Sequence, residues 1–322
     1  MARRGRWKRS ILSPFCGFVR KEFVRMMVTK AMEKADILIE AMKWIREHRG
    51  KTTVIKLGGS LMEDRVAMMH ILLDVVFMET VGMKPVLVHG GGAAISAAMV
   101  AAGIEPRFVQ GRRYTDAASL AIVKKVLATQ ITGDLVREIC GYGGSAEALS
   151  DGFGTNVLFG KKIMLKNAAG GEIDTGFVGA VTRVDTARIE ELLNRGVIPI
   201  IPSYTLTDGQ EGQGLNVNAD TAATEVAKEL KANKLVYVTE VNGVRTDPDD
   251  PNSMIDSLTA ERARALLADG AIVGGMIPKI EACLETIESG VEKIHIINGR
   301  LRHSLLLEIF TSQGVGTEIT EK

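Results

Sequence analysis

From residue 51 to the end of the chain, short apolar stretches alternate with longer stretches in which apolar residues recur every three or four positions. The short stretches predict β-strands over residues 52–57, 85–89, 198–202, 234–238 and 293–297. The longer ones predict helices over residues 62–81, 93–102, 117–139, 187–195, 221–231, 260–269 and 280–289. Because the strands are apolar throughout and helices separate them, we expect an α/β fold, a three-layer αβα sandwich around a mainly parallel sheet.

Two segments depart from this alternation. Between residues 143 and 179 the pattern changes to glycines and short alternating stretches, which predict β-hairpins inserted at the rim of the sheet. Before the first strand, Ala35, Leu38, Met42 and Ile45 recur at helical spacing and Gly50 follows, so an amphipathic helix is predicted over residues 31–48. This additional N-terminal helix must pack either on its own domain or on another subunit.

Composition narrows the partners and the compartment. The 322 residues are 46% hydrophobic and 25% charged, with a net charge of +1, so neither nucleic acid nor an anionic membrane is expected as a partner. Cys16, Cys140 and Cys283 are scattered without CxxC or zinc spacing, which indicates reduced thiols and a cytoplasmic location. No apolar run approaches the 18 residues of a membrane span. The first 30 residues are rich in Arg and Lys, so an organellar transit peptide within residues 1–25 is the alternative to a disordered tail or a later start.

Two lysines stand where a purely structural lysine is unfavourable. Lys56 lies on the first predicted strand, where burying an ammonium group costs several kcal/mol unless the group is paired. Lys279 directly follows Pro278 at the start of a predicted helix, where a cation opposes the helix dipole by about 0.3–1 kcal/mol. An anion that both amines reach would account for both positions, and a transferring phosphoryl group is the candidate.

Two glycine clusters follow predicted strands and lead into helices, namely Leu57-Gly58-Gly59-Ser60 and His89-Gly90-Gly91-Gly92. Exposed backbone N–H groups and a helix dipole favour a bound anion at such places. Neither cluster fits a Walker A loop or GxGxxG, and a tight strand-to-helix turn is the structural alternative. Two clusters together with Lys56 favour the anion site. His89 has no paired histidine or carboxylate in the sequence, so we interpret it as structural.

Polar side chains also gather in two further segments. Asn216-Val217-Asn218-Ala219-Asp220 opens a predicted helix, and either Asn218 or Asp220 can serve as its cap. A cap does not require three polar side chains within five residues, so we predict that the Asp220 carboxylate holds both lysines in place. Arg113, in Gly111-Arg112-Arg113-Tyr114-Thr115-Asp116, could bind a substrate carboxylate bidentately, although an isolated arginine is more often a surface residue.

These segments, in this order, resemble the amino acid kinase superfamily, and within it the kinases that act on N-acetyl-L-glutamate in arginine biosynthesis. The matching segments are Lys56-Leu57-Gly58-Gly59, His89-Gly90-Gly91-Gly92, Gly111-Arg112-Arg113-Tyr114-Thr115-Asp116, Gly176-Phe177-Val178-Gly179, Asn216-Val217-Asn218-Ala219-Asp220 and Gly275-Met276-Ile277-Pro278-Lys279. The resemblance covers about residues 51–319. Each segment alone is weakly specific, whereas six in order are strongly specific.

The resemblance implies ATP-dependent phosphorylation of the γ-carboxylate of N-acetyl-L-glutamate to N-acetyl-L-glutamyl 5-phosphate. That carboxylate is ionised at neutral pH, so the reaction needs no general base. Lys56 and Lys279 would stabilise the transferring phosphoryl group, Asp220 would orient them, and the N–H groups of Gly59 and Gly91 would donate to the same oxygens. N-acetylglutamate would be held by Gly91, Gly92, Arg113 (on its α-carboxylate) and Asn216. ATP would be held by Gly58, Val238, Thr239, Val241, Gly243, Val244 and Met276, with Mg²⁺ bridging its phosphates and no metal site in the protein.

Two features are similar to the arginine-inhibited branch of the family. One is the helix over residues 31–48, which in that branch interlaces dimers into a hexameric ring. The other is the C-terminal segment with His303, Glu308 and Gly316, predicted to bind L-arginine as an inhibitor. Glu308 offers an anion for a guanidinium group, and the glycines allow close backbone approach. The resemblance thus implies a homo-oligomer, a dimer or a hexamer, and three parts: a basic extension with the interlacing helix (1–50), an amino-acid-substrate lobe (51–230) and a nucleotide lobe with the arginine segment (231–322).

Two alternatives remain at this point. A sister kinase acting on an aminoadipate derivative in lysine biosynthesis differs by one substrate methylene, which is worth only about 1–3 kcal/mol in a pocket. A non-catalytic arginine sensor, like the kinase-like domain of acetylglutamate synthase, would be expected to lack the phosphoryl-binding lysines and to carry an acetyltransferase domain. Aspartokinase fits less well, because its KFGGTS segment is not matched at Lys56-Leu57-Gly58-Gly59-Ser60-Leu61.

Overall fold

The computed structural model describes residues 14–58, 60–166, 170–208, 213–247, 250, 252–273, 276–312 and 314–322. The chain divides into two compact units, one ending at Glu47 and the other beginning at His48. The division proposed between lobes at residue 230 stays a prediction. No helix of the described residues is long and apolar enough to cross a membrane. The cytoplasmic location also stays a prediction, and residues 1–13, where a transit peptide would begin, lie outside the described part.

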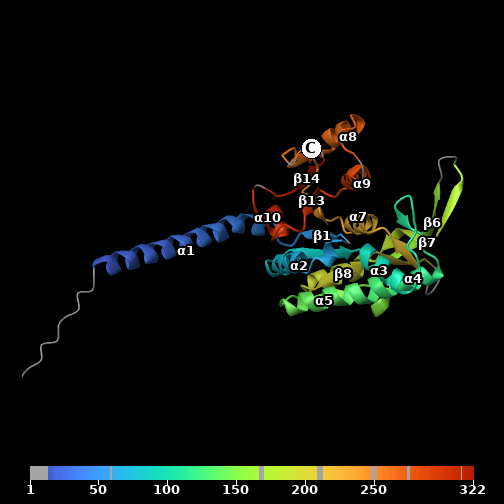
Figure 1. Cartoon of the computed structure of the whole chain (residues 1–322), viewed down its shortest axis with the longest axis horizontal. Helices are drawn as coiled ribbons and strands as arrows, with labels where there is room; N and C mark the ends of the chain where they lie inside the picture. Colours follow the sequence, from blue (N-terminus) through green and yellow to red (C-terminus); the bar gives the residue numbers. More distant parts are fainter. Residues whose placement is uncertain are drawn as a thin grey trace, which may run out of the picture. The chain divides into compact units, whose positions relative to one another are not determined.

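The first unit contains most of one long helix, α1 (Pro14–His48), drawn in blue in Figure 1. It begins at Pro14 rather than at residue 31, where regular apolar spacing begins. Proline is favoured in the first turn of a helix, and residues 18–30 contain neither proline nor glycine to interrupt it. Leu38 and Met42 of the predicted apolar face are exposed.

The second unit is built around a sheet that confirms the predicted α/β class. Eight strands of the described chain pair in the order β12-β14-β13-β11-β1-β2-β8-β5, parallel from β13 to β5, with β14 antiparallel to β13. Their bounds are β1 Thr52–Leu57, β2 Lys84–His89, β5 Ala146–Ala148, β8 Ile198–Pro202, β11 Lys234–Thr239, β12 Ser257–Thr259, β13 Lys293–Asn298 and β14 Thr317–Thr320. All five predicted strands are present, and β1, β2, β8 and β11 are buried almost throughout.

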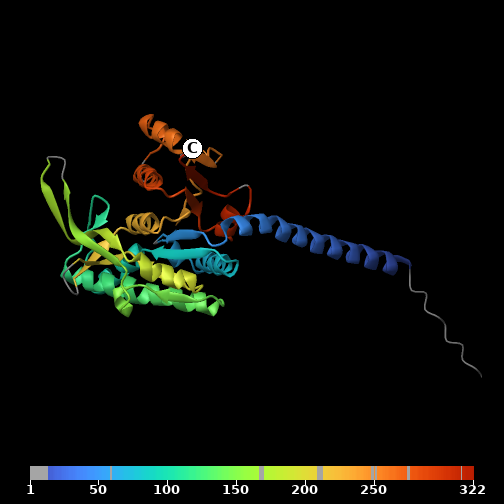
Figure 2. The same cartoon turned by 180° about the vertical axis from the view of Figure 1, so that it is seen from behind.

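Helices cover both faces of this sheet, as Figures 1 and 2 show from opposite sides. One layer consists of α6 (Thr186–Asn194), α7 (Ala219–Glu229), α8 (Ala260–Ala268) and α9 (Met276–Glu288). The other includes α2 (Arg65–Thr80), α3 (Gly92–Ala101), α5 (Thr132–Gly141) and α10 (Ser304–Phe310), with the short turn η1 (Leu61–Glu63) before α2. The helix predicted over residues 117–139 is instead α4 (Ala117–Val123), a π-helical stretch η2 (Lys124–Ile131) and α5.

The predicted hairpins form part of a separate small barrel. The strands β6 (Leu158–Lys166) and β7 (Glu172–Val184) pair antiparallel, and β9 (Tyr204–Thr207) and β10 (Gly214–Val217) close the described barrel in the order β10-β7-β6-β9. A short turn η3 (Asp151–Phe153) precedes it. A further two-stranded ribbon, β3 (Phe108–Val109) and β4 (Arg112–Arg113), places Arg113 beside this barrel.

Candidate active site

The two predicted lysines meet at one carboxylate. Lys56 lies near the carboxyl end of β1 and is 8% exposed. Asp220 lies in the first turn of α7, and Lys279 in the first turn of α9. Lys56 Nζ is 2.8 Å from Asp220 Oδ1, and Lys279 Nζ is 3.4 Å from Asp220 Oδ2. The structure therefore brings together the three side chains for which sequence reasoning predicted a common site.

The charge state of Asp220 follows from this pairing. Burial alone would raise the pKa of Asp220, but the ammonium groups of Lys56 and Lys279 outweigh burial and hold that pKa below its usual value. The cap of α7 is Asn218, whose side chain accepts a hydrogen bond from the backbone N–H of Thr221 at 3.0 Å. Of the two candidate caps named from the sequence, Asn218 therefore caps α7 and Asp220 does not.

The first glycine cluster lies beside the lysines. The Gly58 N–H donates to the Val238 carbonyl at 3.2 Å, and a Cβ at Gly58 would lie 3.0 Å from that oxygen. A side chain at this position would thus press against β11. Gly59, predicted to donate to the phosphoryl group, lies outside the described residues, as do Gly274 and Gly275 before α9.

The predicted substrate residues line one pocket of about 160 Å³. Gly91 caps α3, Gly92 begins it, and Arg113 and Asn216 face the same cavity. Three further lining residues, Val178, Asn218 and Ala219, lie in segments singled out in the sequence without a predicted role in the pocket. Sequence reasoning missed Ile95, Phe108 and Ser203, which stand in none of those segments. Since Asn218 and Ala219 immediately precede Asp220, this pocket adjoins the lysine–carboxylate cluster.

Arg113 is held rigidly although it carries a charge. It is 7% exposed, its Nη2 donates to the Gly92 carbonyl and to Ser96 Oγ at 2.8 Å each, and its Nη1 lies 3.3 Å from Met99 Sδ. The guanidinium carbon also lies 4.8 Å from the centre of the Phe108 ring. This arrangement leaves further guanidinium N–H groups for an anionic ligand, because arginine has five such donors.

A second pocket, of about 370 Å³, is lined in part by Met276, three residues before Lys279 on α9. Of the predicted nucleotide residues, Val241, Gly243 and Met276 line it. The others lie next to it along β11 and its loop: Val238 accepts from Gly58, Thr239 Oγ1 accepts from the Val241 N–H at 3.2 Å, and the Val244 N–H donates to Thr317 Oγ1 at 2.8 Å. Glu240 and Asn242, within the stretch over residues 238–244 predicted to lie near the nucleotide, also line it. Sequence reasoning missed Arg245, Ala271, Ile272, Val273 and Asn298.

His89 is a structural residue, as predicted. It is fully buried, its Nδ1 lies 2.9 Å from the Gly90 carbonyl, and its Nε2 lies 2.9 Å from Thr132 Oγ1. Burial lowers the pKa of His89 to about 4, so the ring is neutral at physiological pH and its Nδ1–H donates to Gly90. The ring thereby joins the second glycine cluster to α5.

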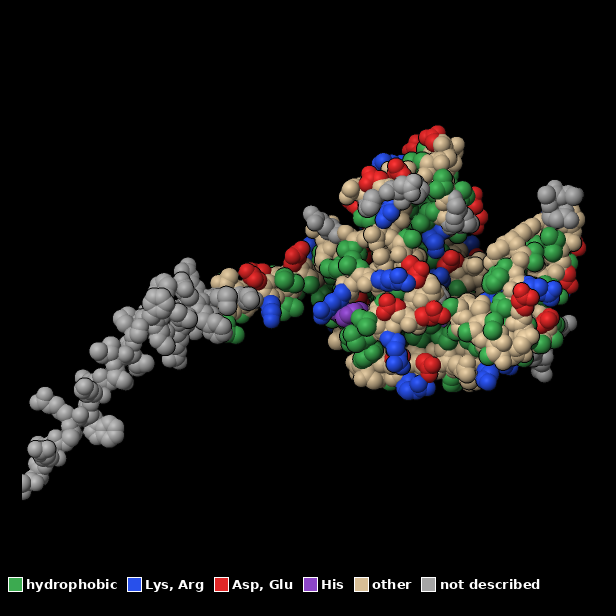
Figure 3. Space-filling model, viewed as in Figure 1, with side chains coloured by type: hydrophobic (Ala, Val, Ile, Leu, Met, Phe, Trp, Pro, Cys, Tyr) green, Lys and Arg blue, Asp and Glu red, His purple; other side chains and the backbone are tan. Residues whose placement is uncertain are grey.

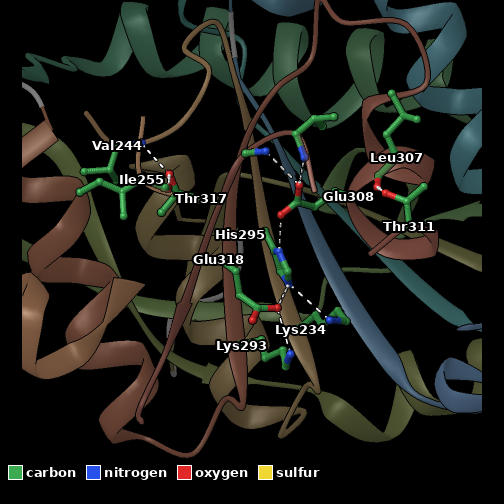
Figure 4. A network of polar contacts seen from close by, with 12 residues as sticks. Lys234, Val244, Ile255, Lys293, His295, Leu307, Glu308, Thr311, Thr317 and Glu318 are labelled. Atoms are coloured by element: carbon green, nitrogen blue, oxygen red, sulfur yellow. Dashed lines mark hydrogen bonds and ion pairs between the residues drawn. The ribbon is translucent and has the colours of Figure 1, made fainter. Parts of the chain in front are cut away.

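The C-terminal residues predicted to bind arginine do not all lie together. Glu308 on α10, labelled in Figure 4, accepts hydrogen bonds from the backbone N–H groups of Val315 (2.7 Å) and Gly316 (3.0 Å). His303 is directed elsewhere, with its Nδ1 2.6 Å from Asp74 Oδ1 on α2. Gly316 and Glu308 are therefore adjacent, whereas the His303 ring contacts Asp74 and His70 on α2.

A histidine from inside the sheet takes the place next to Glu308 instead. His295 on β13 is 2% exposed, and its Nδ1 lies 2.7 Å from Glu308 Oε1 (Figure 4). Its Nε2 lies 3.3 Å from Lys234 Nζ and 3.7 Å from Glu318 Oε2. Burial lowers the pKa of His295, although Glu308 opposes that shift. Sequence reasoning missed His295 and Lys234 because both lie within otherwise apolar strands.

The surface around these sites carries both signs of charge. On the face of residues 48–322 drawn in Figure 3, acidic and basic side chains are interspersed.

Among the described residues, no group of three or more His, Cys, Asp or Glu side chains could hold a metal ion.

The sequence and the fold of this chain are similar to those of known proteins. The model of the amino acid kinase family matches residues 51–298. An acetylglutamate kinase of Heliobacterium modesticaldum is 43% identical over 293 residues, covering 90% of this chain and 99% of the relative. One of Methanocaldococcus jannaschii is 44% identical over 298 residues, covering 92% and 99%. A crystal structure of N-acetylglutamate synthase from Neisseria gonorrhoeae, complexed with coenzyme A and L-arginine, superimposes with a TM-score of 0.75 at 26% identity, covering 89% of this chain and 65% of the synthase.

Proposed function

Since the chain belongs to the amino acid kinase family, we propose that it transfers the γ-phosphoryl group of ATP to the γ-carboxylate of N-acetyl-L-glutamate, a step of arginine biosynthesis. Support comes from acetylglutamate kinases that match nearly their whole length at 43% and 44% identity. The observation that carries the proposal is the placement of Lys56 and Lys279 on the two oxygens of Asp220, next in sequence to Ala219 of one pocket and close in sequence to Met276 of the other.

The proposed phosphoryl transfer requires no proton transfer to or from a protein side chain. A γ-carboxylate oxygen attacks the γ-phosphorus, the bond from that phosphorus to the ADP oxygen breaks, and an acyl phosphate forms. Because the nucleophile is already ionised at neutral pH, no base is required. The main task of the protein is to stabilise the negative charge that spreads over the phosphoryl oxygens in the transition state. Two ammonium groups against one carboxylate leave a net positive charge for this task.

The residues that line the pocket of about 160 Å³ are suited to binding a small anionic ligand. Arg113 would bind the α-carboxylate with the guanidinium N–H groups that Gly92 and Ser96 leave available. Asn216 would bind the acetylated amino group, with its amide already oriented by Thr115 Oγ1 at 3.1 Å. The N-terminus of α3 at Gly91 and Gly92 faces the same cavity and favours negative charge.

ATP would occupy the 370 Å³ pocket, with its base near Val241, Gly243 and Met276. Both oxygens of Asp220 are engaged by lysines, and the described residues hold no cluster of metal ligands. Mg²⁺ would therefore enter with the nucleotide, held by its phosphates and by water, and would supply neutralisation of phosphate charge.

Arginine would inhibit from the site around Glu308. A buried carboxylate that already accepts two backbone N–H groups, with His295 beside it, is suited to a guanidinium ligand. The crystal structure of the synthase of similar fold is a complex with coenzyme A and L-arginine, which supports arginine as a ligand here. Inhibition then requires that arginine bind one arrangement of the protein better than another, because equal affinity shifts no equilibrium.

We also propose that the protein is a homo-oligomer, at least a dimer, in which α1 interlaces dimers into a hexamer. The exposed apolar side chains of α1, among them Ile37, Leu38, Ile39 and Met42, support this role because a second subunit would bury them. Residues 51–230 would carry the amino-acid substrate, and residues 231–322 the nucleotide and arginine.

One assay tests the central proposal. ATP-dependent acyl-phosphate formation is trapped as a hydroxamate, with N-acetyl-L-glutamate or its aminoadipate homologue as substrate and with arginine titrated. We expect turnover with N-acetyl-L-glutamate that falls as arginine rises. Turnover only with the longer homologue would show that the aminoadipate derivative, and not N-acetyl-L-glutamate, is the substrate. Turnover that does not change with arginine would contradict the proposed regulatory site. Folded Lys56→Met and Lys279→Met variants that turn over like wild type would contradict the catalytic assignment.

A further inference from the structure

The aromatic ring of Tyr237 faces Lys279 in the interior of the site. Lys279 Nζ lies 5.2 Å from the centre of the ring, within the range of a cation–π interaction. Tyr237 is fully buried on β11, paired in register with Lys56 on β1. We propose that Tyr237 is a positioning residue for phosphoryl transfer, whose ring holds the Lys279 ammonium group in place without neutralising it. This inference rests on the proposed function.

Lys279 needs a second partner because Asp220 holds it weakly. Its contact with Asp220 is 3.4 Å long, against 2.8 Å for Lys56, so the carboxylate favours the lysine on the strand. Lys279 also lies in the first turn of α9, where the helix dipole repels a cation. A long, flexible side chain under these conditions would spend part of its time away from the phosphoryl group. The ring opposes this loss by attracting the ammonium group toward its face.

A neutral partner serves catalysis better than a second carboxylate would. Another anion beside Lys279 would cancel the positive charge that stabilises the transferring phosphoryl group. Burial raises the pKa of Tyr237 well above its ordinary value and raises the pKa of Cys283, one turn after Lys279, to about 12. Both groups are therefore uncharged at physiological pH, and the ammonium group keeps its charge and its remaining N–H donors.

The ring itself is fixed by the helix that carries Asp220. The Tyr237 hydroxyl and Thr224 Oγ1 lie 2.8 Å apart in a buried hydrogen bond. Thr224 follows Asp220 by four residues on α7, so one face of a single helix orients both partners of Lys279. Thr286, two turns after Lys279 on α9, approaches Thr224 Oγ1 at 3.5 Å. These contacts tie β11, α7 and α9 together around the ammonium group.

The test replaces Tyr237 with phenylalanine and with phenylalanines carrying one to four ring fluorines, which withdraw π-electron density at nearly constant shape. We expect Tyr237→Phe to retain most of the turnover, and log kcat to fall steadily with each fluorine while the KM values for both substrates change little. The whole series, ending with Tyr237→Leu, should lower kcat by about 2- to 30-fold, the range of a cation–π contact. A kcat independent of fluorination would overturn the proposal, because packing alone is insensitive to ring electrons.

The control is the same series at Phe310, a buried ring on α10 that contacts the rings of His48 and Phe77. We expect kcat in the absence of arginine to be unaffected there. An equal decline at Phe310 would mean that fluorination weakens folding in general, and would remove the support for Tyr237.

A second measurement separates this inference from the proposed function. In protein labelled at lysine side chains, the ring current of Tyr237 should shift the resonances of the Lys279 methylene groups, and Tyr237→Leu should abolish the shift. This readout needs no substrate. If the wild-type protein fails to phosphorylate N-acetyl-L-glutamate while the shift is present, the substrate is wrong but the contact stands. If the shift is absent, the contact and the inference both fail.

Discussion

Lys56 Nζ lies 2.8 Å from Asp220 Oδ1, and this short contact joins the central strand of the sheet to the helix that covers it. The second oxygen of the same carboxylate faces Lys279, so Asp220 separates two like charges that would otherwise repel each other at close range. The two lysine side chains can therefore stay close together before a phosphoryl group binds.

Replacing Asp220 with asparagine should lower kcat by about 10²-fold, the loss typical of one group that orients charge toward a transition state. An amide cannot accept from two ammonium groups as an ionised carboxylate does, so Lys56 and Lys279 would diverge. The hydroxamate assay measures the effect. Asp185→Ala, which removes the capping carboxylate of α6, is the control and should cost stability but little turnover.

Arg113→Lys should raise the KM for N-acetyl-L-glutamate by roughly tenfold or more, while kcat at saturation falls less. A lysine keeps the charge but loses the planar fork that Gly92 and Ser96 hold in place. Initial rates at varied substrate, with ATP saturating, give both constants. An unchanged KM would place the α-carboxylate elsewhere. Arg137→Lys, on the exposed side of α5, is the matched control.

Thr317→Val should raise the KM for ATP several-fold without changing the KM for the amino-acid substrate. The Thr317 hydroxyl accepts from the Val244 N–H at 2.8 Å and donates to the Ile255 carbonyl at 2.6 Å, and both bonds are buried. Valine keeps the volume but leaves two buried backbone groups unsatisfied, at about 1–3 kcal/mol each. The loop at Gly243 and Val244 would then be less well ordered. Equal effects on both KM values would indicate general destabilisation.

Glu308→Gln should weaken inhibition by arginine at least tenfold while turnover without arginine stays near the wild-type value. The amide cannot pair ionically with a guanidinium group, although it can still accept from Gly316. The concentration of arginine that halves the rate is the measurement. Glu321→Gln, at the exposed C-terminal end, should leave that concentration unchanged. Retained sensitivity in Glu308→Gln would exclude this site.

His89 should make the protein less stable in mild acid. Its pKa is about 4 in the folded protein and near 6.5 when unfolded, so between these values the unfolded chain binds a proton that the folded chain does not. Stability should therefore fall as the pH drops from 6.5 to 4, by about 3 kcal/mol from this group. Asp74, whose pKa burial raises to about 6, changes stability in the opposite direction. Denaturant unfolding of wild type and His89→Asn across this range isolates the histidine, because only wild type should show the steeper loss.

Much of the candidate active site could be predicted from sequence because it lies at strand ends and helix starts. Lys56, Asp220 and Lys279 stand at unusual positions relative to local elements, and short-range rules identify such positions. The parallel sheet then brings the ends of its strands to one edge, so that residues from distant segments converge. The substrate-binding roles of Gly91, Arg113 and Asn216 followed from the resemblance to the family and stay predictions, although all three line one pocket.

What depends on strand pairing could not be predicted. His295 and Lys234 belong to apolar strands. The pairing of β13 with β11 brings Lys234 to His295, and the packing of α10 brings Glu308 to the other side of the same ring. Tyr237 likewise lies inside the predicted strand over residues 234–238, where no local pattern distinguishes it from its apolar neighbours. Closure of the small barrel likewise depends on the register between β6, β7, β9 and β10, which local patterns do not specify.

The position of β1 has a consequence for synthesis of the protein. This strand pairs with β2, which follows soon after it, and with β11, which emerges from the ribosome only after some 180 further residues. At roughly 5–20 residues per second, one edge of β1 stays unpaired for about 10 s or longer. During that interval the nascent chain presents an apolar strand edge, a known template for aggregation. Slow translation near residues 58–230, or loss of a chaperone that covers this edge, should therefore lower the yield of active protein more than its final stability would suggest.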